Sequence, residues 1–130
     1  MENSKSFKTL EAWKKARAFR KEISALTKTF PKHEQFKLVD QILRSSRSVS
    51  ANIAEGYGRY HYLENMRFCR IARGSLTETL DHLIVAFDEE YISEEKLLQM
   101  EKMHDHCLHL INGYVLFLKN KKKDEKSRPK

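Results

Sequence analysis

Apolar residues recur every three or four positions along most of the chain, which is the spacing of one face of an α-helix. Four stretches carry this pattern, and we expect helices at about residues 9–29, 34–56, 63–89 and 93–120. The inward face of the second helix is formed by Val39, Ile42, Ser46, Val49, Ile53 and Gly56. Four helices joined by three short connections predict an all-α fold, an antiparallel up-down-up-down four-helix bundle.

Capping and breaking residues set the predicted helix ends. Thr9 and Ser93 are placed to cap the first and fourth helices, and Pro31 ends the first helix. The second helix is expected to end at Gly56-Tyr-Gly58, where a glycine can take the left-handed C-cap conformation at little cost.

The composition fits one helical domain over residues 1–130. Four glycines and two prolines are too few for the many turns of a β protein of this length. The chain has no run of eighteen apolar residues and no apolar stretch at its start, so we expect a cytoplasmic protein that does not enter a membrane. Cys69 and Cys107 lie within helical periodicity and are expected to be reduced core thiols. The ends, at about residues 1–6 and 121–130, are expected to be flexible.

A second, polar stripe lies beside the apolar face of the second helix. It consists of Arg44, Ser48, Asn52, Glu55 and Arg59. Short polar and bidentate groups are costly to bury unpaired, so their alignment indicates partners on another helix or another subunit. Ser75 and Glu78 of the third helix are candidate partners, with Glu78 pairing Arg44 or Arg59 and the small Gly74 allowing a close approach. A buried layer that fixes helix register and a solvated outer face both remain open.

The polar stripe also carries a family resemblance. The run Gln41-x-x-Arg44-x-x-x-Ser48-x-x-x-Asn52-Ile53-Ala54-Glu55-Gly56-x-Gly58-Arg59 is similar to the signature of the small four-helix-bundle family named for proteins encoded by intervening sequences in bacterial 23S rRNA genes. Three further motifs resemble the same family: Phe7-x-x-Leu10-x-x-Trp13-x-x-Ala16, Phe30-Pro31-x-x-Glu34 and Ile71-Ala72-x-Gly74-Ser75-Leu76-x-Glu78. The likeness covers roughly residues 7 to 92.

Two positions depart from the family pattern. Leu80 stands where a second acidic residue is expected, and His61 stands where a serine or threonine helix cap often follows the glycine turn. The resemblance implies a ring-like homopentamer, and some relatives are accessory proteins of diversity-generating retroelements that bind RNA and a reverse transcriptase. It therefore implies self-association and RNA or DNA binding, and it leaves a protein partner open. No cofactor is expected.

The charge is uneven as well as positive, with a net value of +7. Residues 1 to 75 contain sixteen Lys and Arg against seven Asp and Glu, residues 76 to 118 contain two against nine, and residues 119 to 130 contain seven against two. A basic first half and a basic tail fit a surface that binds phosphates, whereas the acidic part could pair with a neighbouring copy. The residues expected to contact nucleic acid are Lys14, Lys15, Arg17, Arg20, Lys21 and Arg59.

Aromatic and basic residues alternate around the predicted turn between the second and third helices. Tyr57, Tyr60 and Tyr62 are interleaved with basic residues, which are Arg59, His61 and Arg67. Such rings stack on single-stranded bases in some proteins, but tyrosine and arginine are also enriched in protein interfaces. Both interpretations stay open.

Neither a metal site nor an active site is expected. On a helix, His104 points with the core while His106 and His109 share another face, so at most two of them converge. The serines of residues 45–50 lack a histidine and an acid in a recognisable arrangement, and the chain lacks a phosphate-binding Gly-Lys-Ser/Thr loop. We therefore expect a non-enzymatic, self-assembling helical bundle that binds nucleic acid, RNA first of all. The alternative is an oligomeric protein-protein interaction module that does not touch nucleic acid.

Overall fold

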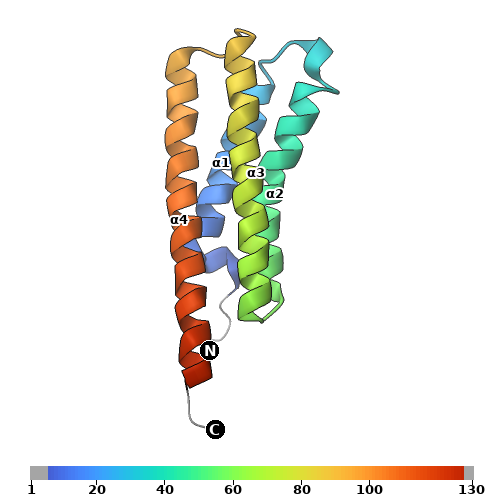
Figure 1. Cartoon of the computed structure of the whole chain (residues 1–130). Helices are drawn as coiled ribbons and strands as arrows, with labels where there is room; N and C mark the ends of the chain where they lie inside the picture. Colours follow the sequence, from blue (N-terminus) through green and yellow to red (C-terminus); the bar gives the residue numbers. More distant parts are fainter. Residues whose placement is uncertain (1–5, 128–130) are drawn as a thin grey trace.

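The computed structural model describes residues 6–127 and contains four long helices (Figure 1). They are α1 (Glu11–Thr27), α2 (Leu38–Gly58), α3 (Tyr62–Asp88) and α4 (Glu94–Ser127). Two 3-10 turns, η2 (Phe7–Thr9) and η3 (Lys32–Glu34), precede α1 and α2. Successive helices run in opposite directions (Figure 1), so the predicted all-α, up-down-up-down bundle is confirmed.

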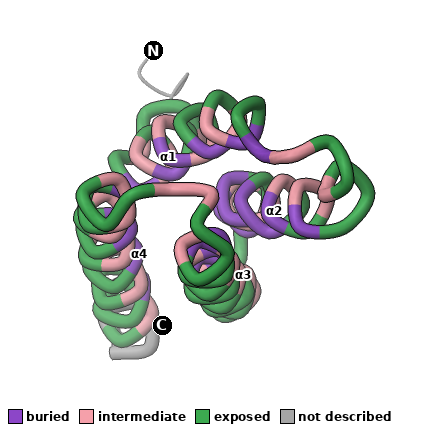
Figure 2. The backbone as a smooth tube through the Cα atoms, turned by 90° about the horizontal axis from the view of Figure 1, so that it is seen from above, coloured by how far each residue is buried: buried purple, intermediate pink, exposed green. Residues whose placement is uncertain are grey.

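Each helix packs on its neighbours in sequence, and α4 also packs on α1. Seen along the bundle, the four helices surround a common interior and turn their buried residues toward it (Figure 2). The largest buried side chains there include Phe19, Ile23, Ile42, Leu83 and Ile111. Each such side chain contributes about 1.5 to 3 kcal/mol when it leaves water. The apolar periodicity therefore predicted the core faces correctly.

The helix starts differ from the predictions at two places. Thr9 lies in η2, and Leu10 precedes α1 without a side-chain cap. The segment around Glu34 forms η3, and α2 begins only at Leu38. The predicted Ser93 cap is present, because the Lys96 backbone N–H donates to Ser93 Oγ at 3.1 Å.

The turn between α2 and α3 does not use glycine as predicted. Gly56 and Gly58 both lie within α2, and among the described residues no glycine has a positive φ. Tyr60 takes the left-handed conformation instead, with a φ of 56°. His61 precedes α3 and makes no side-chain capping bond, as its departure from the family pattern suggested. The chain thus reverses direction through a bulky residue in a conformation that non-glycine residues rarely adopt.

Helix α4 continues to Ser127 instead of ending near Asn120. Lysine and glutamate favour helices even where no core contact supports them, so the charged tail can extend the helix into solvent. Residues 1–5 and 128–130, on which part of the predicted flexible ends falls, lie outside the described residues. Within the described part of the chain, no helix is long and apolar enough to span a bilayer.

Candidate nucleic-acid and assembly surfaces

Helix α1 presents a row of cations on its outer face. Lys14, Arg17 and Lys21 are exposed and follow one another at the three- and four-residue spacing of a single helix face. Lys14 pairs with Glu11 at 3.1 Å, and the Arg17 guanidinium lies 5.9 Å from the centre of the Trp13 ring. Because all three residues of this row are exposed, most of its positive charge faces solvent.

A small basic cavity lies beside this row, between α1 and α2. It has a volume of about 250 Å³ and is lined by Arg20, Lys21, Lys28 and Arg47, together with Ser24 and Ala25. Arg20 is held in place because its Nε donates to Ser50 Oγ of α2 at 3.1 Å. None of the described residues that line this cavity carries a carboxylate. The prediction missed Lys28 and Arg47, although Lys28 lies two helical turns after Lys21 on the same face.

The other two predicted contact residues lie elsewhere. Lys15 turns toward α4, where it borders a separate cavity with His106. Arg59 lies at the α2–α3 end of the bundle, where it pairs with Glu55 at 3.1 Å and lies 5.1 Å from the centre of the Phe68 ring. The six predicted residues therefore form one main surface on α1, with two outlying members.

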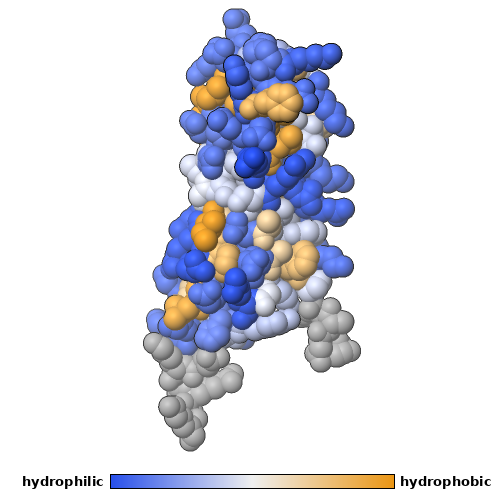
Figure 3. Space-filling view, turned by 90° about the vertical axis from the view of Figure 1, so that its right-hand side faces the viewer, coloured by the Kyte–Doolittle hydropathy of each residue, from blue (hydrophilic) through white to orange (hydrophobic). Residues whose placement is uncertain are grey.

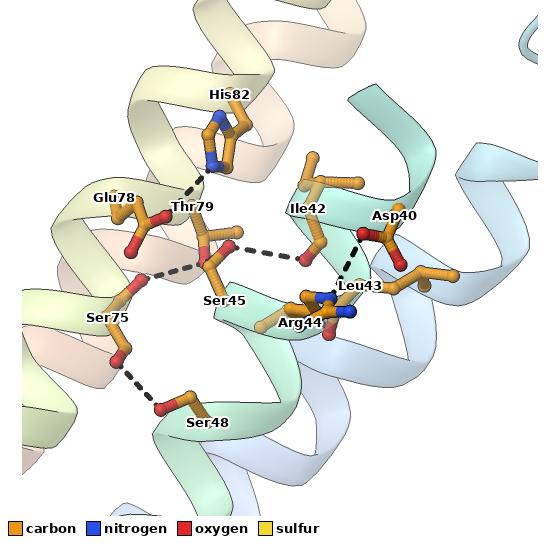
Figure 4. A network of polar contacts seen from close by, with 11 residues as sticks. Asp40, Ile42, Leu43, Arg44, Ser45, Ser48, Ser75, Glu78, Thr79 and His82 are labelled. Carbon is orange, nitrogen blue, oxygen red and sulfur yellow. Dashed lines mark hydrogen bonds and ion pairs between the residues drawn. The ribbon is translucent and has the colours of Figure 1, made fainter. Parts of the chain in front are cut away.

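The polar stripe of α2 has its partners within the chain (Figure 4). Asn52 Nδ2 donates to both the Ser48 hydroxyl and the Ser48 backbone carbonyl at 2.8 Å. The hydroxyls of Ser48 and Ser75 are 2.9 Å apart and join α2 to α3. The prediction that this stripe finds a partner on another helix is thus correct for Ser48 and Ser75.

The charged members of the stripe pair differently from the prediction. Arg44 binds Asp40 at 3.0 Å and Glu78 binds His82 at 3.2 Å, each four residues away on its own helix (Figure 4). Glu78 therefore pairs with neither Arg44 nor Arg59, because a neighbour one helical turn away is reached without crossing to another helix. With Arg44 80% exposed, such a pair contributes at most about 1 kcal/mol.

Gly74 also differs from its predicted role. A methyl group built on it would meet nothing within 4 Å, so it does not serve the close approach of α3 to another helix of this chain. The close approach occurs at Gly56, where the same methyl would lie 2.7 Å from Asn65 Oδ1 and 2.9 Å from Phe68 Cβ.

A fully buried hydroxyl pair, which the sequence did not reveal, lies next to the stripe. The Thr79 hydroxyl is 2.7 Å from the Ser45 hydroxyl and donates to the Ser75 backbone carbonyl at 2.8 Å (Figure 4). Both side chains are buried between α2 and α3. The sequence offered one signal, a serine beside the apolar face of α2, but it did not show which residue would meet it.

A second polar cluster ties η3, in the connection between α1 and α2, to the segment between α3 and α4. The Tyr91 hydroxyl donates to Glu34 Oε2 at 2.6 Å and lies 3.3 Å from His33 Nε2. This hydrogen bond lowers the pKa of the Glu34 carboxyl below its ordinary value and raises the pKa of Tyr91 to about 12. The cluster therefore holds the connection between α1 and α2 against the connection between α3 and α4.

The histidines of α4 separate as predicted. His104 is buried and its Nδ1 lies 2.9 Å from Asp105, whereas His106 and His109 are exposed. Among residues 6–123, no three histidine, cysteine, aspartate or glutamate side chains gather in a way that would hold a metal ion. Burial raises the pKa of Cys69 to about 11 and that of Cys107 to about 12, so both thiols stay protonated near neutral pH.

Large apolar residues also remain on the surface. They include Leu63, Ile71, Ile84 and Val85 of α3, with Leu98 and Leu116 of α4. On the face shown in Figure 3 the hydrophobic residues form separate patches within a mainly hydrophilic surface.

Comparison with known proteins shows what the chain is similar to. The model of the family described as 23S rRNA-intervening sequence protein matches residues 8–113. A crystal structure of a protein with unknown function from the S23 ribosomal protein family, from Bacteroides thetaiotaomicron, superimposes with a TM-score of 0.74 at 25% identity. The match covers 80% of this chain and 94% of the other. No curated protein matches the chain.

Proposed function

The chain belongs to the 23S rRNA-intervening sequence protein family, and from this premise we propose that it is a self-assembling helical bundle that binds nucleic acid and catalyses no reaction. RNA is the first candidate because the family description names an rRNA. The proposal places the protein in the cytoplasm, where it acts as an adaptor or scaffold. The basic surface of α1 is its proposed contact with nucleic acid.

One observation carries the proposal: four cations surround the cavity between α1 and α2, and no carboxylate lines it among the described residues. Unneutralised positive charge concentrated on one surface attracts the phosphate backbone and releases its counterions. The outer row of Lys14 and Arg17 extends this surface along α1. Contacts of this kind need no base-specific side chains, so they favour binding with little sequence preference.

Exposed apolar residues on α3 and α4 support self-association, because burying them against a second copy would remove them from water. The number of subunits, five, comes from the family resemblance. Native mass spectrometry at micromolar concentration should show a closed oligomer, and a monomer alone would contradict this part of the proposal. The same apolar residues favour the alternative function, an oligomeric module that binds only proteins.

A salt titration tests the contact with nucleic acid. The logarithm of the affinity for a labelled RNA should fall linearly with the logarithm of the salt concentration. The double variant Lys21→Gln/Lys28→Gln should flatten this slope by about two units, one for each phosphate that the variant no longer neutralises. Its matched control is Lys96→Gln/Lys102→Gln, which removes the same charge from the acidic part of the chain and should leave the slope unchanged.

Two results would reject nucleic-acid binding at this surface. One is the absence of binding to RNA and DNA at low salt. The other is an equal flattening of the slope in both double variants, which would show that only net charge matters. Either result would favour the protein-binding module, whose partner could then be recovered by crosslinking in the native host.

A further inference from the structure

A cavity lies at the end of the bundle that holds the α2–α3 turn. It has a volume of about 510 Å³, within the range of small-molecule sites in proteins. Five aromatic rings line it: Tyr57, Tyr60, Tyr62, Tyr114 and Phe117. They come from both sides of the turn and from α4, so residues far apart in the sequence build one aromatic surface.

Two of these rings form a nearly parallel pair on α4. The Tyr114 and Phe117 rings have centroids 6.2 Å apart and planes that differ by 13°. Asn65 of α3, which is buried, donates from Nδ2 to the Tyr114 hydroxyl at 2.9 Å. The Tyr114 ring is therefore held in place by Asn65, while its partner Phe117 stays 52% exposed.

Tyr60 supplies an exposed ring at the edge of the cavity. It is 89% exposed, although it occupies the left-handed turn position that a glycine or asparagine fills at lower cost. Core packing does not explain a tyrosine at this position, because almost none of its surface is covered. Unfavourable backbone conformations of this kind concentrate at functional sites.

Positive charge lies beside the rings. Lys121 Nζ is 5.7 Å from the centre of the Phe117 ring, and Arg59, which pairs with Glu55, directly precedes Tyr60 in the sequence. No carboxylate lines the cavity among the described residues. Aromatic rings flanked by cations match the requirements of an unpaired nucleobase, whose flat face stacks while its phosphates meet the charges.

We propose that this cavity binds one unpaired base of a single-stranded nucleic acid, in contact with both Phe117 and Tyr60, with an adjacent phosphate near Lys121. A base within a duplex cannot enter, because both of its faces are already stacked. The site lies away from the basic cavity between α1 and α2, so a strand would be held by phosphate contacts at one surface and by a base at another. This inference depends on the proposed function in one respect: the bound nucleic acid supplies the base.

The direct test uses two variants that spare the core. Tyr60→Asn removes the ring and suits the left-handed turn, and Phe117→Leu keeps an apolar residue on α4. Each should weaken binding of a single-stranded ten-nucleotide RNA by about 5- to 100-fold, the range expected when one stacking interaction is removed, and should leave duplex binding and the salt slope unchanged. The matched control is Phe36→Leu, which removes an equally exposed ring (86%) from the α1–α2 connection at the opposite end of the bundle (Figure 1).

A second measurement separates this inference from the proposed function. Adenosine and uridine carry no phosphate, so their binding does not depend on the basic surface. At millimolar concentration they should shift the NMR signals of the Asn65 side-chain amide in the parent protein and not in the Phe117→Leu variant. Absence of a shift would overturn the inference even if RNA binds elsewhere, and a shift would support it even if RNA binding through α1 fails.

Two further outcomes would also overturn the inference. One is an equal loss of single-stranded and duplex binding in the Tyr60 and Phe117 variants, which would indicate a general disturbance of the surface. The other is an Asn65 signal that changes with protein concentration and not with nucleoside. That result would show that a second copy of the chain fills the cavity.

Discussion

Gly56 should be far less tolerant of alanine than the other helical glycines. A methyl group there would lie 2.7 Å from Asn65 Oδ1, 2.9 Å from Phe68 Cβ and 3.0 Å from the Asn65 backbone oxygen. The last two atoms cannot rotate away, so α2 and α3 would have to separate. Overpacking of this kind costs about 1 to 3 kcal/mol, against which the better helix propensity of alanine returns about 1 kcal/mol.

Gly74→Ala is the matched control, because Gly74 also lies within a helix and its added methyl would meet nothing within 4 Å. Only the propensity effect applies there, so this variant should gain about 0.5 to 1 kcal/mol. The two alanine variants should therefore differ by up to about 3 kcal/mol in their free energy of unfolding, with Gly56→Ala the less stable. Urea unfolding followed by circular dichroism at 222 nm measures this difference.

The measurement should be repeated at several protein concentrations, since self-association would make the midpoint depend on concentration. The reasoning is refuted if Gly56→Ala exceeds the parent in stability. It is also refuted if Gly74→Ala loses as much stability as Gly56→Ala, because the close approach would then not be the cause.

Three further predictions follow from buried and hydrogen-bonded groups. Thr79→Val should lower the free energy of unfolding by about 1 kcal/mol in urea unfolding because it leaves the Ser45 hydroxyl with a poorer partner, and adding Ser45→Ala should cost less than the two single changes summed. Both cysteines should resist a thiol reagent at pH 8 in the folded protein and react in denaturant, since burial raises their pKa to about 11 and about 12. The stability difference between the parent and Tyr91→Phe should be constant near neutral pH. It should shrink as pH falls through the lowered pKa of Glu34, and as pH rises from about 10 toward the Tyr91 pKa of about 12, which urea unfolding across pH would show.

The core could be predicted because its signal is local and repeated. Ile23, Ile42 and Leu83 each recur with other apolar residues at helical spacing, and burial of one helix face requires nothing more. The turn at Tyr60 could not be predicted, because glycine normally takes the left-handed conformation and two glycines lie close by. Local preference was overridden there by the geometry of the α2–α3 connection.

The candidate surfaces were predicted less well than the fold. Charged side chains are long and pair with whichever opposite charge is nearest, so Arg44 takes Asp40 and Glu78 takes His82 instead of crossing between helices. Of the rings that line the aromatic cavity, the sequence singled out Tyr57, Tyr60 and Tyr62 but not those of α4. Asn65 and Tyr114 are 49 positions apart in sequence, and only the packing of α3 against α4 brings them together.

Helix α4 carries opposite charge at its two ends. It begins with Glu94 and Glu95 and ends with the lysines after Leu118, and its 34 residues span about 50 Å. Charge is screened over about 8 Å at physiological salt, so a polyanion that approaches one end of this helix does not feel the other. The acidic end repels it and the lysine end attracts it. A polyanion that approaches along α4 should therefore be drawn to the lysine end of this helix and not to its start.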